Sequence, residues 1–184
     1  MPDNSDFELV KKFLEGDESS FNRLINKYQQ KIYWHARRMT GSHLDSDEVV
    51  QEVLLVLYNK LKDFQFKSSL YTWIYRITST RSINYLNKRK IRQFLSFEDM
   101  NSSEIGVNED IVNDIDIKDK IKKLDKFLQT LPAKQREIFI FRNIDGLSYE
   151  EISEISGKSV GGLKSNYFHA INKISEMMKN EFDE

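Results

Sequence analysis

Residues 131–174 read LPAKQREIFIFRNIDGLSYEEISEISGKSVGGLKSNYFHAINKI, and this stretch decides the fold. Ser148 stands where a helix N-cap is expected, with Glu151 three residues later as its capping-box partner. Gly157 supplies the positive φ that a sharp turn requires, and Ser159 can cap the helix that follows. The pattern predicts two short helices, a tight turn and a longer third helix.

The third helix has one apolar and one polar face. Its apolar residues recur at helical spacing and predict a buried stripe of Leu163, Tyr167, Ala170, Ile171 and Ile174. The opposite face carries side chains that can reach phosphates or base edges in a major groove: Lys164, Ser165, Asn166, His169 and Lys173. This arrangement is typical of a helix-turn-helix DNA reader. The alternative is an ordinary helical hairpin with a solvated polar face.

Composition narrows the class of protein. The chain has 184 residues, 39% of them hydrophobic and 31% charged, which fits one or two small domains. Only 2 prolines and 7 glycines interrupt good helix formers, and no strand-like alternation is present, so the fold class is all-α. With 0 cysteines, disulfides and thiolate metal sites are excluded. Without a signal peptide or a membrane segment of its own, we expect the chain to be soluble and cytoplasmic.

Helical spacing organises the rest of the chain. Residues 93–117 are rich in polar and acidic side chains and predict a linker. We therefore expect two small helical domains, at 1–92 and 118–184, joined by this flexible acidic linker, with the helix-turn-helix in the second. The remaining helices are predicted at 6–14, 18–40, 47–64 (capped by Asp45 or Ser46), 70–91, 118–130 and 133–142.

The net charge of −1 conceals two opposite blocks. Between Lys60 and Arg92, nine of the ten charged residues are basic, whereas between Glu98 and Asp119 eight of nine are acidic. A charge run is usually a solvated helix face, but so strong a bias favours a nucleic-acid face followed by a separate negative segment.

Two sets of motifs resemble the extracytoplasmic-function (ECF) group of bacterial sigma factors. Residues 46–64 (SDEVVQEVLLVLYNKLKDF) and 68–90 (SSLYTWIYRITSTRSINYLNKRK) are similar to the family's polymerase-binding and promoter-melting helices. Residues 131–165 are similar to its −35-reading domain. The resemblance covers most of residues 6–175. It implies a sigma factor whose partners are core RNA polymerase and promoter DNA, with no catalytic role, cofactor or metal, and with an anti-sigma factor as a further possible partner.

The resemblance also implies roles for individual residues. Polymerase contacts would come from Asp47, Glu48, Gln51 and Glu52. The residues that would capture a flipped −10 base and bind the single strand are Phe64, Gln65, Phe66, Lys67, Ser68, Ser69, Tyr71, Arg76, Thr80, Arg81, Asn84, Lys88 and Arg89. Reading of the −35 element would come from Ser159, Val160, Gly162, Lys164, Ser165, Asn166, His169 and Lys173.

Some of these positions carry a qualification. Among the aromatic residues, Phe64 is the one most expected in the core, and Trp73 is expected to be structural. Many relatives have asparagine at the position of Thr80 and aspartate at that of Asn84. Relatives usually carry arginines where this chain has Asn166 and His169 or Ile171, so weaker phosphate affinity and a different base choice are expected.

Two other classes of function remain as alternatives. A stand-alone helix-turn-helix regulator would bind DNA as a dimer, and the final segment 174–182 offers little surface for dimerisation. An enzyme would need a catalytic or metal-binding cluster. His35, His43 and His169 are isolated in the sequence, and no glycine-rich phosphate loop is present.

Overall fold

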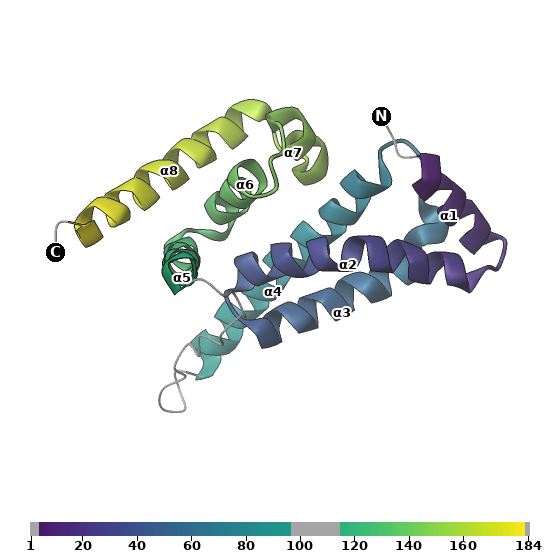
Figure 1. Ribbon diagram of the computed structural model, residues 1–184, viewed down its shortest axis with the longest axis horizontal. Helices are drawn as coiled ribbons and strands as arrows, with labels where there is room; N and C mark the ends of the chain where they lie inside the picture. The colour runs from purple at the N-terminus through teal and green to yellow at the C-terminus, as the bar shows by residue number, and fades with distance from the viewer. Residues whose placement is uncertain (1–3, 97–114, 183–184) are drawn as a thin grey trace.

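The computed structural model describes residues 4–96 and 115–182, and within these ranges the chain is helical and contains no strand (Figure 1). The all-α prediction is confirmed. Most of the predicted linker lies outside the described residues. The elements are α1 (Asn4–Leu14), α2 (Glu18–Thr40), α3 (His43–Lys60), the 3-10 turn η1 (Leu61–Asp63), α4 (Leu70–Ser96), α5 (Ile115–Thr130), α6 (Ala133–Asn143), α7 (Tyr149–Ser156) and α8 (Val160–Phe182).

The largest differences from the predicted boundaries concern α3 and α4. The predicted cap of α3 at Asp45 or Ser46 is wrong: the cap is Ser42, whose side chain accepts a hydrogen bond from the Asp45 amide at 3.4 Å. Asp45 lies in the first turn and binds Arg89 of α4 instead. Helix α4 continues to Ser96, because no glycine or proline stops it after the predicted end at Ile91.

The helix-turn-helix forms as its sequence predicts. Ser148 and Glu151 make a reciprocal capping box at the start of α7. Gly157 ends α7 in the left-handed conformation, with φ 69°. The Ser159 hydroxyl then accepts from the Gly162 amide at 3.3 Å, which caps α8. Leu163, Ala170 and Ile174 of the predicted stripe are buried, while Tyr167 and Ile171 are partly buried.

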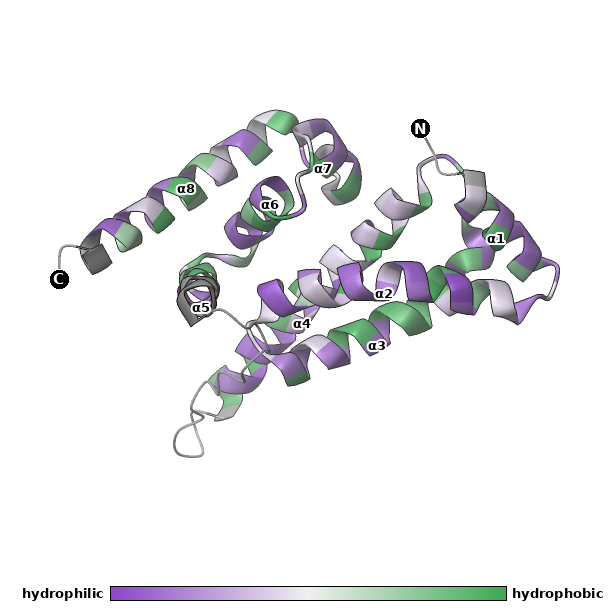
Figure 2. Ribbon diagram, viewed as in Figure 1, coloured by the Kyte–Doolittle hydropathy of each residue, from purple (hydrophilic) through white to green (hydrophobic). Residues whose placement is uncertain are grey.

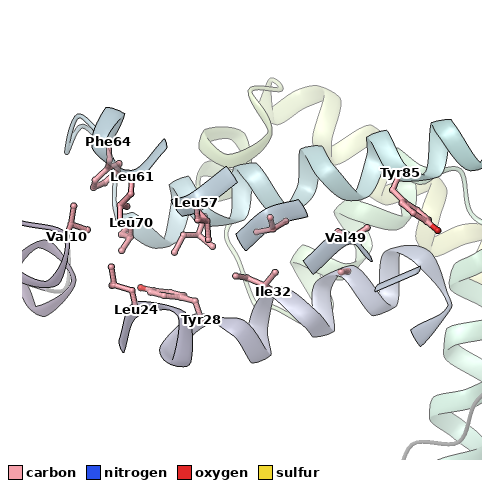
Figure 3. Packing of buried hydrophobic residues seen from close by; sticks show 13 residues of the cluster. Val10, Leu24, Tyr28, Ile32, Val49, Leu57, Leu61, Phe64, Leu70 and Tyr85 are labelled. Atoms are coloured by element: carbon pink, nitrogen blue, oxygen red, sulfur yellow. The ribbon is translucent and has the colours of Figure 1, made fainter. Parts of the chain in front are cut away.

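Helices α1–α4 enclose one hydrophobic cluster. Figure 3 shows Val10 of α1, Leu24 and Ile32 of α2, and Val49 and Leu57 of α3 turned toward a common interior. Their exposed fractions do not exceed 3%. At the centre of a close-packed interior, each methyl group removed leaves a cavity that neighbours fill only in part.

Helices α5–α8 pack against α2 and α4 rather than standing apart from them. Figure 1 shows α6 and α7 beside α4, and α5 lies near the end of α2. Met39 of α2 and Leu86 of α4 belong to a cluster with side chains of α5, α6 and α8. Over the described residues, no helix combines the length and the apolar content needed to cross a bilayer.

Replacing Ile32 with alanine tests the shared interior of α1–α4. Ile32 is 0% exposed, so Ile32→Ala should lower the free energy of unfolding by about 2–5 kcal/mol. Leu44→Ala is the control, since Leu44 is 75% exposed and should change stability by less than about 0.5 kcal/mol. Urea denaturation followed by circular dichroism measures both, and equal losses would contradict the packing.

Candidate protein and nucleic-acid interfaces

One face of α3 is exposed along its whole length. We call this face the α3 stripe; its members recur at helical spacing and are Leu44, Glu48, Gln51, Leu55 and Tyr58. The three apolar members are 75%, 64% and 45% exposed in that order. Exposed leucines aligned with polar side chains are typical of a surface that another protein covers.

The α3 stripe contains only half of the predicted polymerase contacts. Glu48 and Gln51 lie on it, whereas Asp47 and Glu52 flank it and are partly buried. Glu52 lies 3.8 Å from Arg81 and 3.6 Å from Lys88, both on α4. The sequence interpretation selected only acidic and amide residues as contacts and missed the apolar members of the stripe. The helical spacing of Gln51, Leu55 and Tyr58 already indicated that these three residues share one face.

A hollow of about 440 Å³ adjoins the α3 stripe near its end. Phe21, Gln51, Leu54, Leu55 and Tyr58 line it, and Figure 2 shows that apolar residues gather in this half of α3. The Tyr58 hydroxyl donates to a carboxylate oxygen of Glu18 at 3.0 Å, and this hydrogen bond raises the pKa of Tyr58. The lining of the hollow is mostly apolar, which suits an apolar side chain of a partner.

The connection between η1 and α4 separates core aromatics from exposed ones. Phe64 is 5% exposed and packs against Trp73, with ring centroids 5.3 Å apart, so both residues are structural. Phe66 is 40% exposed, and its φ of 57° is unusual for a bulky residue. Gln65 and Lys67 are exposed beside it. Of the predicted base-capture residues here, these three are the ones that can meet a nucleotide.

The polar and aromatic residues around the start of α4 have their own partners. Ser69 caps the helix by accepting from the Thr72 amide at 3.0 Å, and Ser68 is half-buried beside it. The Tyr71 ring lies 4.3 Å from that of Tyr75, and burial is the main cause of its raised pKa. Tyr71 therefore faces the interior side of α4 rather than the loop.

The predicted strand-binding residues of α4 fall into two groups. Thr80 and Asn84 have exposed side chains, and so does Lys88, which also lies 3.6 Å from Glu52. Arg81, Arg89 and Arg76 are each held by other parts of the chain: Arg81 by Glu52, Arg89 by Asp45 at 2.6 Å, and Arg76 by the main-chain oxygens of Glu154 and Ile155.

The recognition helix α8 presents most of its predicted contacts to solvent. Ser159, Gly162, Lys164, Ser165, His169 and Lys173 are exposed, while Val160 and Asn166 are half-buried. The Asn166 side chain donates to the Gly162 carbonyl at 2.8 Å, and Lys173 donates to the Thr130 carbonyl at 2.9 Å. Each of these hydrogen bonds uses one donor, and both side chains keep a further donor that DNA could use.

Comparisons with known proteins assign the family. The model of Sigma-70 region 2 matches residues 24–91, and the model of Sigma-70, region 4 matches residues 121–174. The ECF RNA polymerase sigma-E factor of Escherichia coli (strain K12) is 31% identical over 182 residues, with 95% of each chain covered. The chain belongs to the ECF RNA polymerase sigma factors. The sigma-E factor of Haemophilus influenzae is 30% identical and covers 95% of this sigma factor and 97% of its own length.

Solved structures share the fold of this sigma factor. CnrH in complex with the cytosolic domain of CnrY is 20% identical and superposes with a TM-score of 0.69, over 96% of this chain and 98% of CnrH. The sigma factor RpoE from Bartonella quintana, in complex with the anti-sigma factor NepR, is 24% identical with a TM-score of 0.70, over 86% and 96% of the two chains.

Phe168 of the sigma factor is a surface residue that the sequence interpretation missed. It lies on α8 between Tyr167 and His169, is 61% exposed, and has its ring centroid 5.9 Å from that of His169. An apolar side chain on the polar face of a recognition helix can meet the methyl group of a thymine. The interpretation had sorted α8 into an apolar stripe and polar donors, and Phe168 belongs to neither set.

The histidines of the sigma factor have structural surroundings. His35 is 0% exposed and stacks on Phe141, with its Nδ1 atom 3.4 Å from a carboxylate oxygen of Asp145. His43 lies 3.5 Å from Asp47, one turn along α3. Within the part of the chain that the structure describes, no three potential ligands gather in a way that could hold a metal ion.

Proposed function

We propose that this ECF sigma factor, working in the cytoplasm, binds core RNA polymerase through the α3 stripe, opens the −10 element with α4 and the loop before it, and reads the −35 element with α8. The predicted domains at 1–92 and 118–184 divide these tasks, and the segment between them connects the two promoter contacts. The observation that carries the proposal is the presence of three separate exposed faces on one chain, each with the chemistry that its partner requires.

The chemistry of each face supports its role. The α3 stripe joins an acidic and an amide side chain to exposed leucines, which suits a protein partner with a basic, partly apolar groove. The loop before α4 offers an exposed phenylalanine and a lysine, which suit a base and a phosphate of single-stranded DNA. The α8 face carries lysines, hydroxyls and an amide, which suit the major groove.

Transcription in vitro tests the proposal. The purified chain, core polymerase and a library of genomic promoter fragments should together yield transcripts from a defined subset of fragments. Absence of both promoter-specific transcripts and core binding would overturn it. High-affinity shifting of duplex DNA by the chain alone would instead favour a stand-alone helix-turn-helix regulator.

We also propose that an anti-sigma factor covers this chain in the cell. The support is the fold shared with CnrH and RpoE, whose structures are complexes with CnrY and the anti-sigma factor NepR. Affinity capture from native cells should recover such a regulator together with polymerase. Recovery of polymerase alone would count against a dedicated regulator.

Truncating Leu55 should weaken binding to core polymerase. Leu55→Ala removes an exposed side chain from the hollow beside the α3 stripe, and we expect a loss of about 1 kcal/mol or more, which is at least about fivefold in Kd. Leu95→Ala is the matched control, since Leu95 is 62% exposed on α4, away from the stripe. Fluorescence anisotropy with labelled core measures both, and equal effects would remove the stripe from the interface.

Truncating Lys67 should change how salt affects strand binding. If Lys67 contacts a phosphate, Lys67→Ala should reduce the slope of log K against log salt by about 0.7 for single-stranded DNA. Lys62→Ala, which removes another exposed lysine just upstream, should leave the slope unchanged. A titration of the non-template strand at several salt concentrations decides between them, and identical slopes for all three proteins would exclude Lys67 from the contact.

Truncating Phe168 should relax base choice at one position of the −35 element. We expect Phe168→Ala to lower the preference for thymine there by roughly fivefold or more. Selection from a randomised duplex, read out as transcripts, compares the two proteins. Replacing that thymine with deoxyuridine should reduce use by the wild-type chain and leave the variant unaffected. An unchanged preference in the variant would contradict the contact.

A further inference from the structure

A pocket of about 340 Å³ lies where the two halves of the chain, α1–α4 and α5–α8, meet. We call it the α2 pocket; helix α2, the start of α4 and the loop between α6 and α7 line it with Gln30, Lys31, Trp34, Arg38, Tyr71, Tyr75, Ile144 and Asp145. Its volume falls within the roughly 300–1,000 Å³ of sites for small ligands. The four residues from α2 have no part in the proposed function, so the pocket needs its own explanation.

Two cations in the α2 pocket are held by aromatic rings rather than by carboxylates. Lys31 Nζ lies 5.4 Å from the centroid of the Tyr71 ring, and Arg38 Cζ lies 5.4 Å from that of the Trp34 ring. A ring face attracts a cation through its quadrupole, which positions the cation without cancelling its charge. Among the described residues, no carboxylate forms an ion pair with Lys31 or Arg38. Both cations can therefore bind an anion.

The tyrosines of α4 add a flat aromatic wall to the α2 pocket. The ring centroids of Tyr71 and Tyr75 are 4.3 Å apart, and the two rings are inclined by 30°. Burial is the main cause of the raised pKa of Tyr75, the charge of Asp145 adds to it, and the charge of Arg38 opposes it. Flat aromatic side chains beside unpaired cations suit a ligand that is itself flat and negatively charged.

The loop between α6 and α7 adds a hydrogen-bond acceptor to the α2 pocket. The side chain of Asp145 is 12% exposed, and a carboxylate oxygen lies 3.4 Å from Nδ1 of the fully buried His35. An ionised carboxylate has about four acceptor sites, so this contact leaves Asp145 able to accept from a ligand. The pocket thus offers cations for an anionic group and a carboxylate for N–H donors.

We propose that the α2 pocket binds a free guanine nucleotide, with its phosphate at Lys31 and Arg38 and its base at Asp145. A nucleotide joins a flat ring to a phosphate, which is the combination that the pocket suits. The edge of guanine carries two adjacent donors, N1–H and N2–H, which one carboxylate can accept side by side. Adenine presents a single donor there beside an acceptor nitrogen, which a carboxylate repels. The site is additional to the three faces of the proposed function, so its loss would leave that function intact.

Titration of the full chain with GMP tests the site by calorimetry and by tryptophan emission. We expect GMP to bind about fivefold or more tightly than AMP. Binding should quench the emission of the wild-type chain and leave that of Trp34→Phe unchanged, because the chain has 2 tryptophans and Trp73 does not line the pocket. No saturable binding of GMP up to about 1 mM would overturn the inference.

Variants of the charged residues assign the two ends of the nucleotide. Lys31→Ala should weaken GMP binding about tenfold or more, because it removes a cation from the phosphate. Arg23→Ala is the matched control: it removes an exposed cation of α2 about two turns before the pocket and should bind GMP as the wild type does. Lys31 is exposed, so its replacement should leave the fold intact, which circular dichroism checks. Equal affinities of these two variants would contradict the phosphate contact.

Asp145→Asn tests the base contact through the sign of its effect. Removal of a negative charge alone would tighten the binding of any anion, whereas loss of the acceptor for guanine should weaken GMP binding and remove its preference over AMP. Tighter GMP binding by Asp145→Asn would overturn the inference.

A nucleotide within the promoter strand has the same chemistry as a free one, and a single-stranded DNA pentamer with one central guanine separates the two sources. The pentamer should bind no more tightly than GMP. Tighter binding of the pentamer that is lost in Lys31→Ala would assign the pocket to the strand and overturn the proposal of a free nucleotide.

Discussion

A buried carboxylate connects the two halves of this sigma factor. Glu137 is almost inaccessible to water and is paired with Ser79 of α4 and with Lys158 of the turn between α7 and α8. A charge in such a place has to be paired, so its partners set the position of α4 against α6 and α7. The arginine contacts to α7 and the shared hydrophobic clusters are consistent with the same register. The packing of the two halves thus depends on polar geometry as much as on apolar area.

Acidic residues of α3 partly neutralise the positive charge of α4. Glu52 lies near Arg81 and Lys88, and Asp45 holds Arg89 and accepts from Tyr85, whose pKa is raised first by burial and then by this hydrogen bond. Under the proposed function, DNA competes with Glu52 and Asp45 for these cations. Helix α8 likewise offers only lysines as fixed cations, because it contains no arginine.

The sequence predicted local structure well because the relevant signals are local. The capping box at Ser148, the turn at Gly157 and the helical spacing of α2 depend on neighbours a few residues away, and all three were confirmed. The packing of Tyr75, Met39 and Leu86 against the second half depends on contacts between distant parts of the chain, which no periodicity encodes. Arg76 illustrates the limit: it is exposed as its sequence position predicts, but the hydrogen bonds of its guanidinium to two carbonyls of α7 could not be predicted. The exposed Leu55 and Phe168 were missed because they belong neither to the apolar stripes nor to the sets of polar side chains from which the site residues were chosen.

The central claim is that α4 and α8, whose halves pack together in the free chain, contact two separate elements of one promoter in the initiation complex. The distance between the halves tests it most directly. Since the chain has no native cysteine, fluorophores can be attached at two exposed sites on neighbouring helices, Asn87→Cys in α4 and Lys126→Cys in α5, and energy transfer measured in single molecules. The account predicts one narrow high-transfer population for the free chain and a shift to low transfer when core polymerase and promoter DNA are added. The same transfer efficiency in the free chain and in the transcribing complex would contradict it.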